Sequence, residues 1–123
     1  MNRYQILIEY EGTLYNGWQI QKKGKSIQEN IEIVLSKLLK EKIKIYGSGR
    51  TDTGVHAKEQ SAHFDTTNKI IQKDKLLNSL NFFLNKKKIS ILKIKKKNKL
   101  FHSRYSAKER RYIYLIRNDV SPS

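Results

Sequence analysis

The chain has 123 residues, no cysteine, and 26 lysine and arginine residues against 11 acidic ones, which gives a formal net charge of +15. This length fits one domain, and a chain without cysteine forms no disulfide and no thiolate metal site. The sequence has no apolar run long enough to span a membrane and no signal-peptide pattern, so we expect a cytoplasmic protein that binds a polyanion, with nucleic acid favoured over an anionic membrane surface.

The lysines alone are weak evidence for binding, because AT-rich codons enrich lysine without selection for a ligand. The six arginines carry more weight, because the planar guanidinium group matches the geometry of a phosphate. Four of the six follow position 103, at Arg104, Arg110, Arg111 and Arg117. The end of the chain is therefore the first candidate for nucleic-acid contacts.

The chain begins with a predicted strand and a glycine-containing loop. Residues 3–10 alternate in polarity with a period of two, which is typical of a strand. Residues 11–25 form the predicted loop and contain the only tryptophan, Trp18. We interpret Trp18 as a lid over the edge of the core, and the alternative is that Trp18 and Tyr15 line a substrate cleft.

Two segments show the apolar periodicity of a helix. Ser26 and Glu29 form a capping-box pattern, and apolar residues then recur at helical spacing to about Lys40. A second stripe covers residues 76–84, with Asn85 as the expected C-cap. Both helices are expected to pack against the core.

Four further segments are predicted to be strands. They are residues 43–46, 60–65, 89–94 and 111–117. In the third of these the alternation slips by one position, which indicates a β-bulge. The basic run that follows it, residues 95–99, is interpreted as a solvated hairpin or loop.

The predicted order is strand, helix, strand, strand, helix, strand, followed by one more strand. This order is typical of an α+β, ferredoxin-like (split βαβ) fold, with an antiparallel sheet and both helices on one face. The other face of the sheet is then free to bind a ligand. The whole of residues 1–123 is expected to form one such subdomain.

The densest group of glycines lies in the segment Gly47–His56, between two predicted strands. Glycine there allows close backbone approach and holds neighbouring side chains at fixed angles. A guanidinium at Arg50 keeps the carboxylate of Asp52 ionised, so Asp52 is a candidate nucleophile or base. The alternative is an Asx-turn in which Asp52 caps its own backbone and Arg50 pairs with it on the surface.

A metal site is a second interpretation of nearby residues. His56, His63 and Asp65 supply two imidazoles and a carboxylate, and a nuclease would use them with a divalent cation. Without a thiol or a spaced carboxylate cluster this is weak evidence. We therefore expect no metal.

Several motifs together resemble the tRNA pseudouridine synthase A family. The Gly-Arg-Thr-Asp-x-Gly-Val-His pattern after a strand resembles its signature. The other motifs, in chain order, are Glu9–Thr13, Tyr15–Gln21, Ser26–Glu29, Gln60 with His63 and Phe64, Phe101–Ala107 and Arg110–Tyr114. The resemblance covers nearly the whole chain and implies the N-terminal half of the pseudouridine synthase fold.

The resemblance also implies roles for individual residues. Asp52 is the implied nucleophile, Arg50 helps to displace the base or clamps a phosphate, and Tyr112 stacks on the uracil. Without the family, Tyr112 reads as a core aromatic on a sheet face. Further RNA contacts are expected at Arg104, Arg110, Arg111, His56 and Lys96.

The implied activity is isomerisation of uridine to pseudouridine at positions 38 to 40 of the tRNA anticodon stem-loop, by a homodimer without a cofactor. Family members carry a second domain of similar size, so this chain is expected to be a fragment that is inactive alone. Thr53 stands where the family usually has alanine. The rival hypothesis is a non-catalytic RNA-binding module that stacks bases on Tyr112 and Tyr114.

Overall fold

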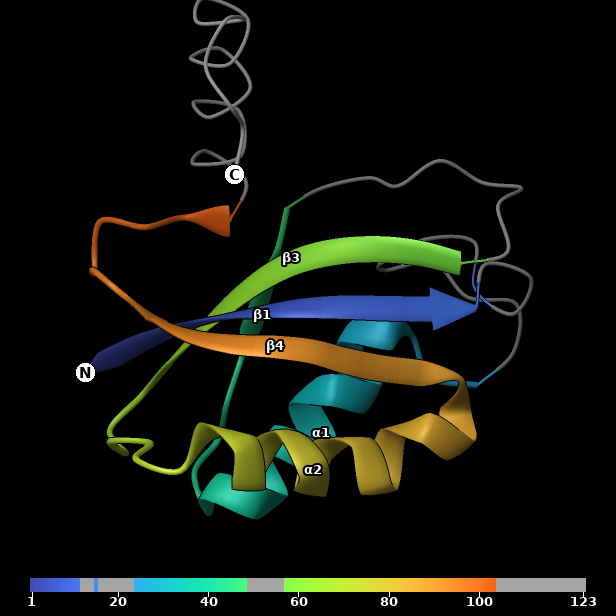
Figure 1. Ribbon diagram of the computed structural model, residues 1–123, viewed down its shortest axis with the longest axis horizontal. Helices are drawn as coiled ribbons and strands as arrows, with labels where there is room; N and C mark the ends of the chain where they lie inside the picture. Colours follow the sequence, from blue (N-terminus) through green and yellow to red (C-terminus); the bar gives the residue numbers. More distant parts are fainter. Residues whose placement is uncertain (12–14, 16–23, 49–56, 104–123) are drawn as a thin grey trace, which may run out of the picture.

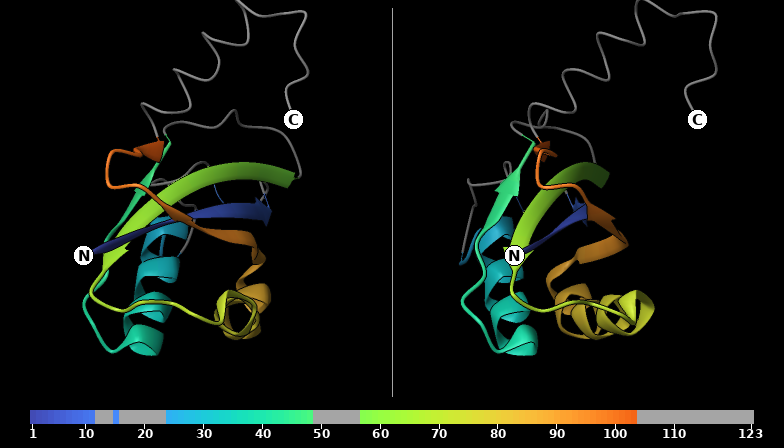
Figure 2. Two further views of the ribbon diagram at one scale, coloured as in Figure 1. Left: turned by 60° about the vertical axis from the view of Figure 1, so that its left-hand side comes forward. Right: turned by 90° about the vertical axis from the view of Figure 1, so that its left-hand side faces the viewer.

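The computed structural model describes residues 1–11, 15, 24–48 and 57–103. Its elements are β1 (Asn2–Glu11), α1 (Ile27–Leu39), β2 (Ile45–Gly47), β3 (Ala57–Thr66), α2 (Lys73–Leu84), the short 3-10 helix η1 (Asn85–Lys87) and β4 (Ile89–Lys97). The strands form one sheet in the order β2-β3-β1-β4, and each neighbouring pair is antiparallel. Both helices lie on one face of the sheet, which confirms the predicted split βαβ fold (Figures 1 and 2).

The hydrophobic core lies between the helices and the sheet. Along β1 every second side chain from Tyr4 to Tyr10 is buried, and the ring of Tyr4 stacks on that of Phe64 in β3 at 5.8 Å. The helices contribute their inward-facing residues, including Ile31 of α1 and Leu80 of α2. The period-two and helical apolar patterns of the sequence thus meet in one core.

The predicted slip in β4 is a β-bulge. Leu7 of β1 pairs with Lys93, and the next residue, Ile8, pairs with Ile91, so Leu92 is the extra residue. Leu92 is 44% exposed. The bulge keeps isoleucines on the helix side both before and after it, and this explains why the alternation of the sequence shifts by one position.

Helix α1 is capped at both ends by local interactions. The Ser26 hydroxyl accepts a hydrogen bond from the Glu29 amide, and the Glu29 carboxylate accepts one from the Ser26 amide, each at 3.1 Å. This confirms the predicted capping box. At the other end Lys40 adopts a left-handed conformation, with φ of 54°. The carboxylate of Glu41 then binds the end of β3, where it accepts a hydrogen bond from Thr66 Oγ1 at 2.7 Å.

The largest differences from the predicted element boundaries are in β3, α2 and β4, and β1 and β2 differ by one or two residues at each end. β3 extends beyond residues 60–65 at both ends because β1 pairs with it along its full length. α2 begins at Lys73, before the predicted apolar stripe of residues 76–84. Residues 95–97, predicted as a hairpin or loop, belong to β4, because β1 supplies their backbone partners and pairing overrides the low strand propensity of lysine.

The predicted strand at residues 111–117 lies outside the described residues. No helix in the described ranges is long and apolar enough to cross a membrane.

The face of the sheet opposite α1 and α2 is called the far face below. It was predicted to be free, and part of it is covered. After β4 the chain turns back, and residues 101–103 contact His63 of β3 on this face. The far face is therefore covered near the β2 edge by a polar and aromatic cluster.

Candidate functional site

The predicted catalytic segment is bounded by two described residues, Ser48 and Ala57. The residues between them, 49–56, lie outside the described part of the structure. The predictions that fall there are Arg50, Asp52 and His56. The structure therefore describes the residues that flank this segment on both sides.

Both ends are fixed on β3. Ser48 continues the pairing of β2, because its amide donates to the Ser61 carbonyl at 2.9 Å. Ala57 begins β3 and is paired with Glu11 of β1. The segment thus leaves β2 at the level of Ser61 and returns at Ala57, at the start of the same strand.

The second anchoring point on β3 is His63. Its side chain is 2% exposed, and Nδ1 lies 2.8 Å from the hydroxyl of Ser103, which is itself fully buried. The Ser103 backbone amide donates to the same Nδ1 at 3.2 Å. Because an amide N–H is only a donor, Nδ1 carries the lone pair and the neutral ring holds its proton on Nε2.

Aromatic rings surround His63 on its other sides. Tyr46 of β2 stacks on the imidazole, with centroids 5.2 Å apart and an interplanar angle of 24°. His102 and Phe101 contact it with steeply inclined rings, at centroid distances of 4.7 and 6.1 Å. These five residues, Tyr46, His63, Phe101, His102 and Ser103, are called the His63 cluster below.

Burial and nearby positive charge keep His63 neutral. The pKa of His63 is lowered from 6.5 to about 4. Desolvation by burial is the largest cause, and the nearby Arg3 and His102 act in the same direction. Asp65 acts in the opposite direction and is outweighed. Near neutral pH the imidazole is therefore a hydrogen-bond acceptor at Nδ1, as the contact with Ser103 requires.

Arg3 joins the sheet to the segment that follows β4. Its guanidinium binds Asp65 through two parallel hydrogen bonds, Nε to Oδ1 at 2.8 Å and Nη2 to Oδ2 at 2.9 Å. Nη1 donates to the backbone carbonyls of Lys99 and Phe101. The hydrogen bond from Arg3 is the main cause of the lowered pKa of Asp65. Arg3 and His63 therefore hold the same segment at two points.

The two anchoring points bring distant parts of the sequence together. Ser61 holds Ser48, and His63, two residues further along β3, holds Ser103. Two residues of a strand span about 6.5–7 Å. Ser48 is thus held by the backbone of β3 in the plane of the sheet, and Ser103 is held by a β3 side chain on the far face.

Several predicted contact residues lie outside the described residues. These are Arg104, Arg110, Arg111 and Tyr112. Lys96 is described, and it pairs with Tyr4, so it projects on the helix side of β4 with Nζ 5.9 Å from the Tyr4 ring centroid. Its neighbour Lys97 lies on the far face, 5.2 Å from the Phe101 ring centroid. Lys96 stays a predicted RNA contact, reached from the β4 edge of the sheet.

The metal interpretation loses two of its ligands to other partners. Nδ1 of His63 accepts hydrogen bonds from Ser103, and both carboxylate oxygens of Asp65 bind Arg3. His56 lies outside the described residues. Within the described ranges no three histidine, cysteine, aspartate or glutamate side chains converge as a metal site would require.

Sequence reasoning did not identify Arg3, Tyr46 or Ser103 as part of this region. Most of their partners lie far away in the sequence. Ser103, for example, is 40 positions from His63. Ser103 lies inside the Phe101–Ala107 motif, and His63 lies in the motif after the glycine segment. The available signal was that each motif carries a polar residue, His63 or Ser103, that the apolar pattern of its segment does not explain.

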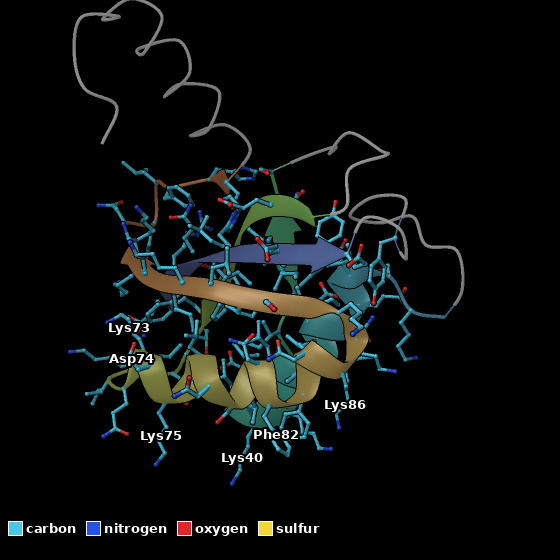
Figure 3. All side chains as sticks on the ribbon, turned by 45° about the vertical axis from the view of Figure 1, so that its right-hand side comes forward. Lys40, Lys73, Asp74, Lys75, Phe82 and Lys86 are labelled. Atoms are coloured by element: carbon cyan, nitrogen blue, oxygen red, sulfur yellow. The ribbon has the colours of Figure 1, made fainter. Side chains whose placement is uncertain are left out.

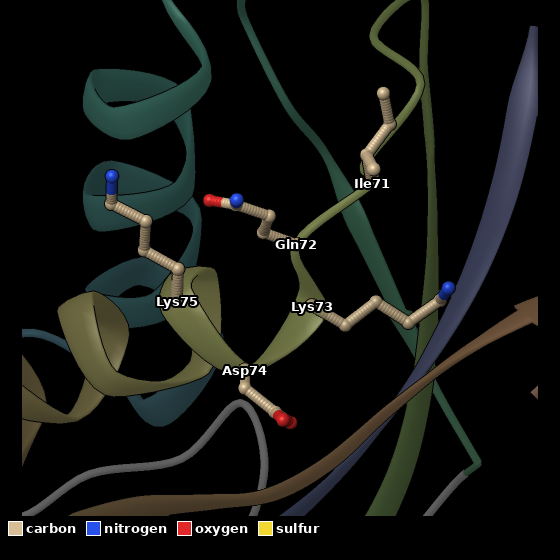
Figure 4. Close-up of a pocket in the computed structure, with 5 residues that line it drawn as sticks. All are labelled: Ile71, Gln72, Lys73, Asp74 and Lys75. Atoms are coloured by element: carbon tan, nitrogen blue, oxygen red, sulfur yellow. The ribbon is translucent and has the colours of Figure 1, made fainter.

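Other surface features lie away from this region. Lys40, Lys75, Phe82 and Lys86 point away from the sheet on the outer side of the helices (Figure 3). A shallow depression at the start of α2 is lined by residues 71–75 alone (Figure 4). Neither feature includes a sequence-predicted site residue.

Comparison with known sequences identifies a family. The sequence model described as tRNA pseudouridine synthase matches residues 6–106, which include both anchoring points and the segment between Ser48 and Ala57. The chain belongs to the tRNA pseudouridine synthase family.

Individual relatives are proteins named tRNA pseudouridine synthase A. The chain is 61% identical over 121 residues to that of Pelagibacter ubique and 45% identical over 120 residues to that of Neorickettsia sennetsu, in each case over 98% of the chain. It is 48% identical over 123 residues to that of Ruminiclostridium cellulolyticum. In each case the match covers 49% of the relative, so the chain spans about half the length of the curated relatives it matches.

Proposed function

We propose that the complete protein carrying this chain is a tRNA pseudouridine synthase, an isomerase in which Asp52 is the nucleophile. The observation that carries the proposal is the family match over residues 6–106, which includes the Gly-Arg-Thr-Asp segment. The paired ends of β2 and β3 support it, because they fix both ends of that segment on one strand. A carboxylate held between fixed ends can meet a base that has been flipped out of its stack.

The reaction breaks the bond between ribose C1′ and uracil N1 and forms a bond between C1′ and C5. A proton leaves C5, and N1 gains one, so the isomerisation needs no electrons from outside and no cofactor. Asp52 would form the covalent bond, to C6 of the base or C1′ of the sugar, and Tyr112 would stack on the uracil and take the late proton. Arg50 would occupy the space left by the flipped base or bind a phosphate.

The substrate is the tRNA anticodon stem-loop, with uridines at positions 38 to 40 as targets. The net charge of +15 supports capture of a polyanion. Arg104, Arg110, Arg111, His56 and Lys96 are the proposed RNA contacts. The complete protein would act as a cytoplasmic homodimer, and a second half would complete the pocket, so residues 1–123 alone would be inactive.

The deciding experiment replaces the nucleophile in the complete protein. Asp52→Asn should reduce tritium release from C5-labelled tRNA uridine to background and leave the affinity for tRNA within about threefold, because the substitution removes reactivity and keeps shape. Residues 1–123 alone should release no tritium in the same assay.

Asp74→Asn is the matched control. Asp74 lies at the start of α2, on the helix side of the sheet (Figure 4). The same chemical change there should leave tritium release at the wild-type rate. Full activity of Asp52→Asn would refute the assignment of the nucleophile.

One observation favours the alternative of a non-catalytic RNA-binding module. Tyr46 is partly exposed on the far face, and lysines 93, 95 and 97 project from β4 on the same face. A sheet face with an aromatic ring and cations is suited to bases and phosphates. This alternative predicts salt-dependent RNA binding by residues 1–123 and no effect of Asp52→Asn on any property of the complete protein.

A further inference from the structure

We propose that the outer side of the helices carries an RNA-binding site, where an unstacked base lies on the ring of Phe82 and lysines contact the neighbouring phosphates. Four residues form the site, and they are called the Phe82 patch below: Phe82, Phe83, Lys37 and Lys86. The patch includes none of the residues assigned to the isomerisation. The inference rests on the proposed function only for the choice of tRNA as the RNA.

The patch is centred on an exposed aromatic ring. Phe82 is 72% exposed, more than any other aromatic residue in the described ranges. It points away from the sheet on the outer side of α2 (Figure 3). The ring of Phe83 meets it at an interplanar angle of 89°, with centroids 5.1 Å apart. Phe83 therefore supports the Phe82 ring, and the exposed surface of Phe82 is open to a ligand.

Two lysines hold ammonium groups beside these rings. Lys86 Nζ lies 5.7 Å from the Phe82 centroid and 6.0 Å from that of Phe83. Lys37 reaches across from α1, with Nζ 6.0 Å from the Phe83 centroid. Lys40, at the end of α1, also points away from the sheet (Figure 3). Proteins bind unstacked nucleotides with such surfaces, because the base stacks on the ring and the cations meet its phosphates.

The carboxylates of the helical layer are bound elsewhere or lie at a distance. Glu29 belongs to the capping box of α1, and Glu32 accepts from the first amide of β2 at 2.9 Å. Glu41 binds the end of β3, and Asp74 lies in the first turn of α2, about two turns before Phe82. Among the described residues no carboxylate forms an ion pair with either lysine of the patch. The patch therefore presents positive charge to an anionic ligand.

The size of the apolar surface favours RNA over a protein or a membrane. On α1 and α2 the large apolar side chains that are exposed are Ile33, at 49%, and Phe82. A stable protein interface buries about 1,200–2,000 Å² around an apolar core, and a helix that lies in a membrane surface needs a continuous apolar face. One ring between ammonium groups matches one base and its phosphates. The family to which the chain belongs is described as a tRNA pseudouridine synthase, so RNA is the anionic ligand we infer.

The first test measures the affinity of the complete protein for tRNA by filter binding. Phe82→Ala should weaken it by at least about fivefold, which is the effect of losing one base stacked on an aromatic ring. Phe82→Leu keeps an apolar side chain without the aromatic ring, and it should lose as much. Phe82→Tyr keeps the ring and should stay within about twofold of the wild type. Equal affinities of Phe82→Leu and the wild type would overturn base stacking at this position.

The second test repeats the measurement at several salt concentrations. Lys86→Gln should reduce the slope of log affinity against log salt by about 0.7–0.9, because one phosphate contact is lost. Lys69→Gln is the matched control. Lys69 is exposed in the loop before α2, at the opposite end of that helix from Lys86, so its removal should leave the slope unchanged. Equal slopes for Lys86→Gln and Lys69→Gln would contradict a phosphate contact at the patch.

A photo-cross-link identifies what covers the ring. The complete protein with p-benzoylphenylalanine in place of Phe82 should cross-link to tRNA on irradiation. Cross-linking only to a second copy of the protein would overturn the RNA site. Binding to phosphatidylglycerol vesicles that Phe82→Ala abolishes, with tRNA affinity unchanged, would overturn it in favour of a membrane surface.

The outcomes separate this site from the proposed function, because binding is measured without turnover. If tRNA cross-links at position 82 and the complete protein releases no tritium, the proposed function fails and the RNA site stands. If tritium release depends on Asp52 and Phe82→Ala binds tRNA as the wild type does, only the RNA site is overturned.

Discussion

The two faces of the sheet are held together by different chemistry. The helix side is closed by apolar side chains, such as Phe64 against Tyr4, that are almost fully buried. The far face carries the His63 cluster and the Arg3–Asp65 pair, in which hydrogen bonds, charge and ring stacking act together. Apolar burial stabilises the fold at any pH, whereas the contacts of the far face depend on protonation and on exact partners.

The largest expected effect is a loss of stability caused by a core substitution on the helix side of the sheet. Phe64→Ala removes a ring that is 0% exposed, and it should lower the free energy of unfolding by about 3–5 kcal/mol because a cavity remains. Urea unfolding followed by circular dichroism measures the change. Phe82→Ala is the matched control, since Phe82 is 72% exposed, and it should change the same quantity by no more than about 0.5 kcal/mol.

The next effect concerns pH and acts through the far face. The folded pKa of His63 is about 4, below its ordinary value of 6.5, so the neutral ring stabilises the fold above pH 6.5. As the pH falls from 6.5 towards 4, the unfolded chain binds a proton that the folded chain does not. Stability should fall by about 2–3 kcal/mol across that window.

Urea unfolding at several pH values tests this against His63→Asn, which does not titrate. Between pH 6.5 and 4, the free energy of unfolding of the variant should fall less steeply with pH. The difference in slope should correspond to about one bound proton. The lowered pKa values of Glu29 and Glu41 give losses that begin near their ordinary value of 4.5, and both residues are present in His63→Asn, so their contribution cancels in the comparison. Identical pH profiles of the two proteins would contradict a buried neutral His63.

A smaller effect is expected from the ion pair on the far face. Arg3 and Asp65 are partly exposed, so solvent screens their attraction, and a double-mutant cycle with Arg3→Met and Asp65→Asn should give a coupling energy of about 1–2 kcal/mol. Thermal or urea unfolding of the four proteins supplies the values. A coupling energy near zero would show that Arg3 acts mainly through the carbonyls of Lys99 and Phe101.

The smallest effect compares two neighbouring lysines on opposite faces. Lys96 lies over Tyr4 and Lys97 over Phe101, both as cation–aromatic contacts with exposed or half-buried side chains. Lys96→Gln and Lys97→Gln should each change the free energy of unfolding by about 0.5–1 kcal/mol or less. A larger loss of tRNA affinity in Lys96→Gln, measured at several salt concentrations, would then report an RNA contact.

The sequence patterns predicted most of the elements and buried residues on the helix side of the sheet. The apolar period in β1, the capping box at Ser26 and the slip in β4 all depend on neighbours within a few residues, so local pattern is sufficient. It failed for residues 95–97, because strand pairing with β1 outweighs the propensity of lysine. The start of α2 at Lys73 was missed for a different reason: no side chain caps this end of the helix, so the sequence carries no local start signal.

The far face was less predictable. Nothing local to Ser103 indicates that its partner is His63, and nothing local to Arg3 indicates Asp65, 62 positions away. Such pairs follow from strand order and register, which place Arg3 opposite Asp65 once β1 and β3 are paired. The family resemblance located the segment with Asp52, and the structure adds where its two ends are held.

The bulge in β4 has a consequence for length changes during evolution. Leu92 is the residue that has no partner in the register with β1, while Ile91 and Lys93 pair with consecutive residues, Ile8 and Leu7. Losing the codon for Leu92 would leave every other side chain of the strand facing its present layer. Losing a codon elsewhere in the middle of β4 would turn lysines inwards or isoleucines outwards. A gap in this strand among related genes is therefore expected at this one position.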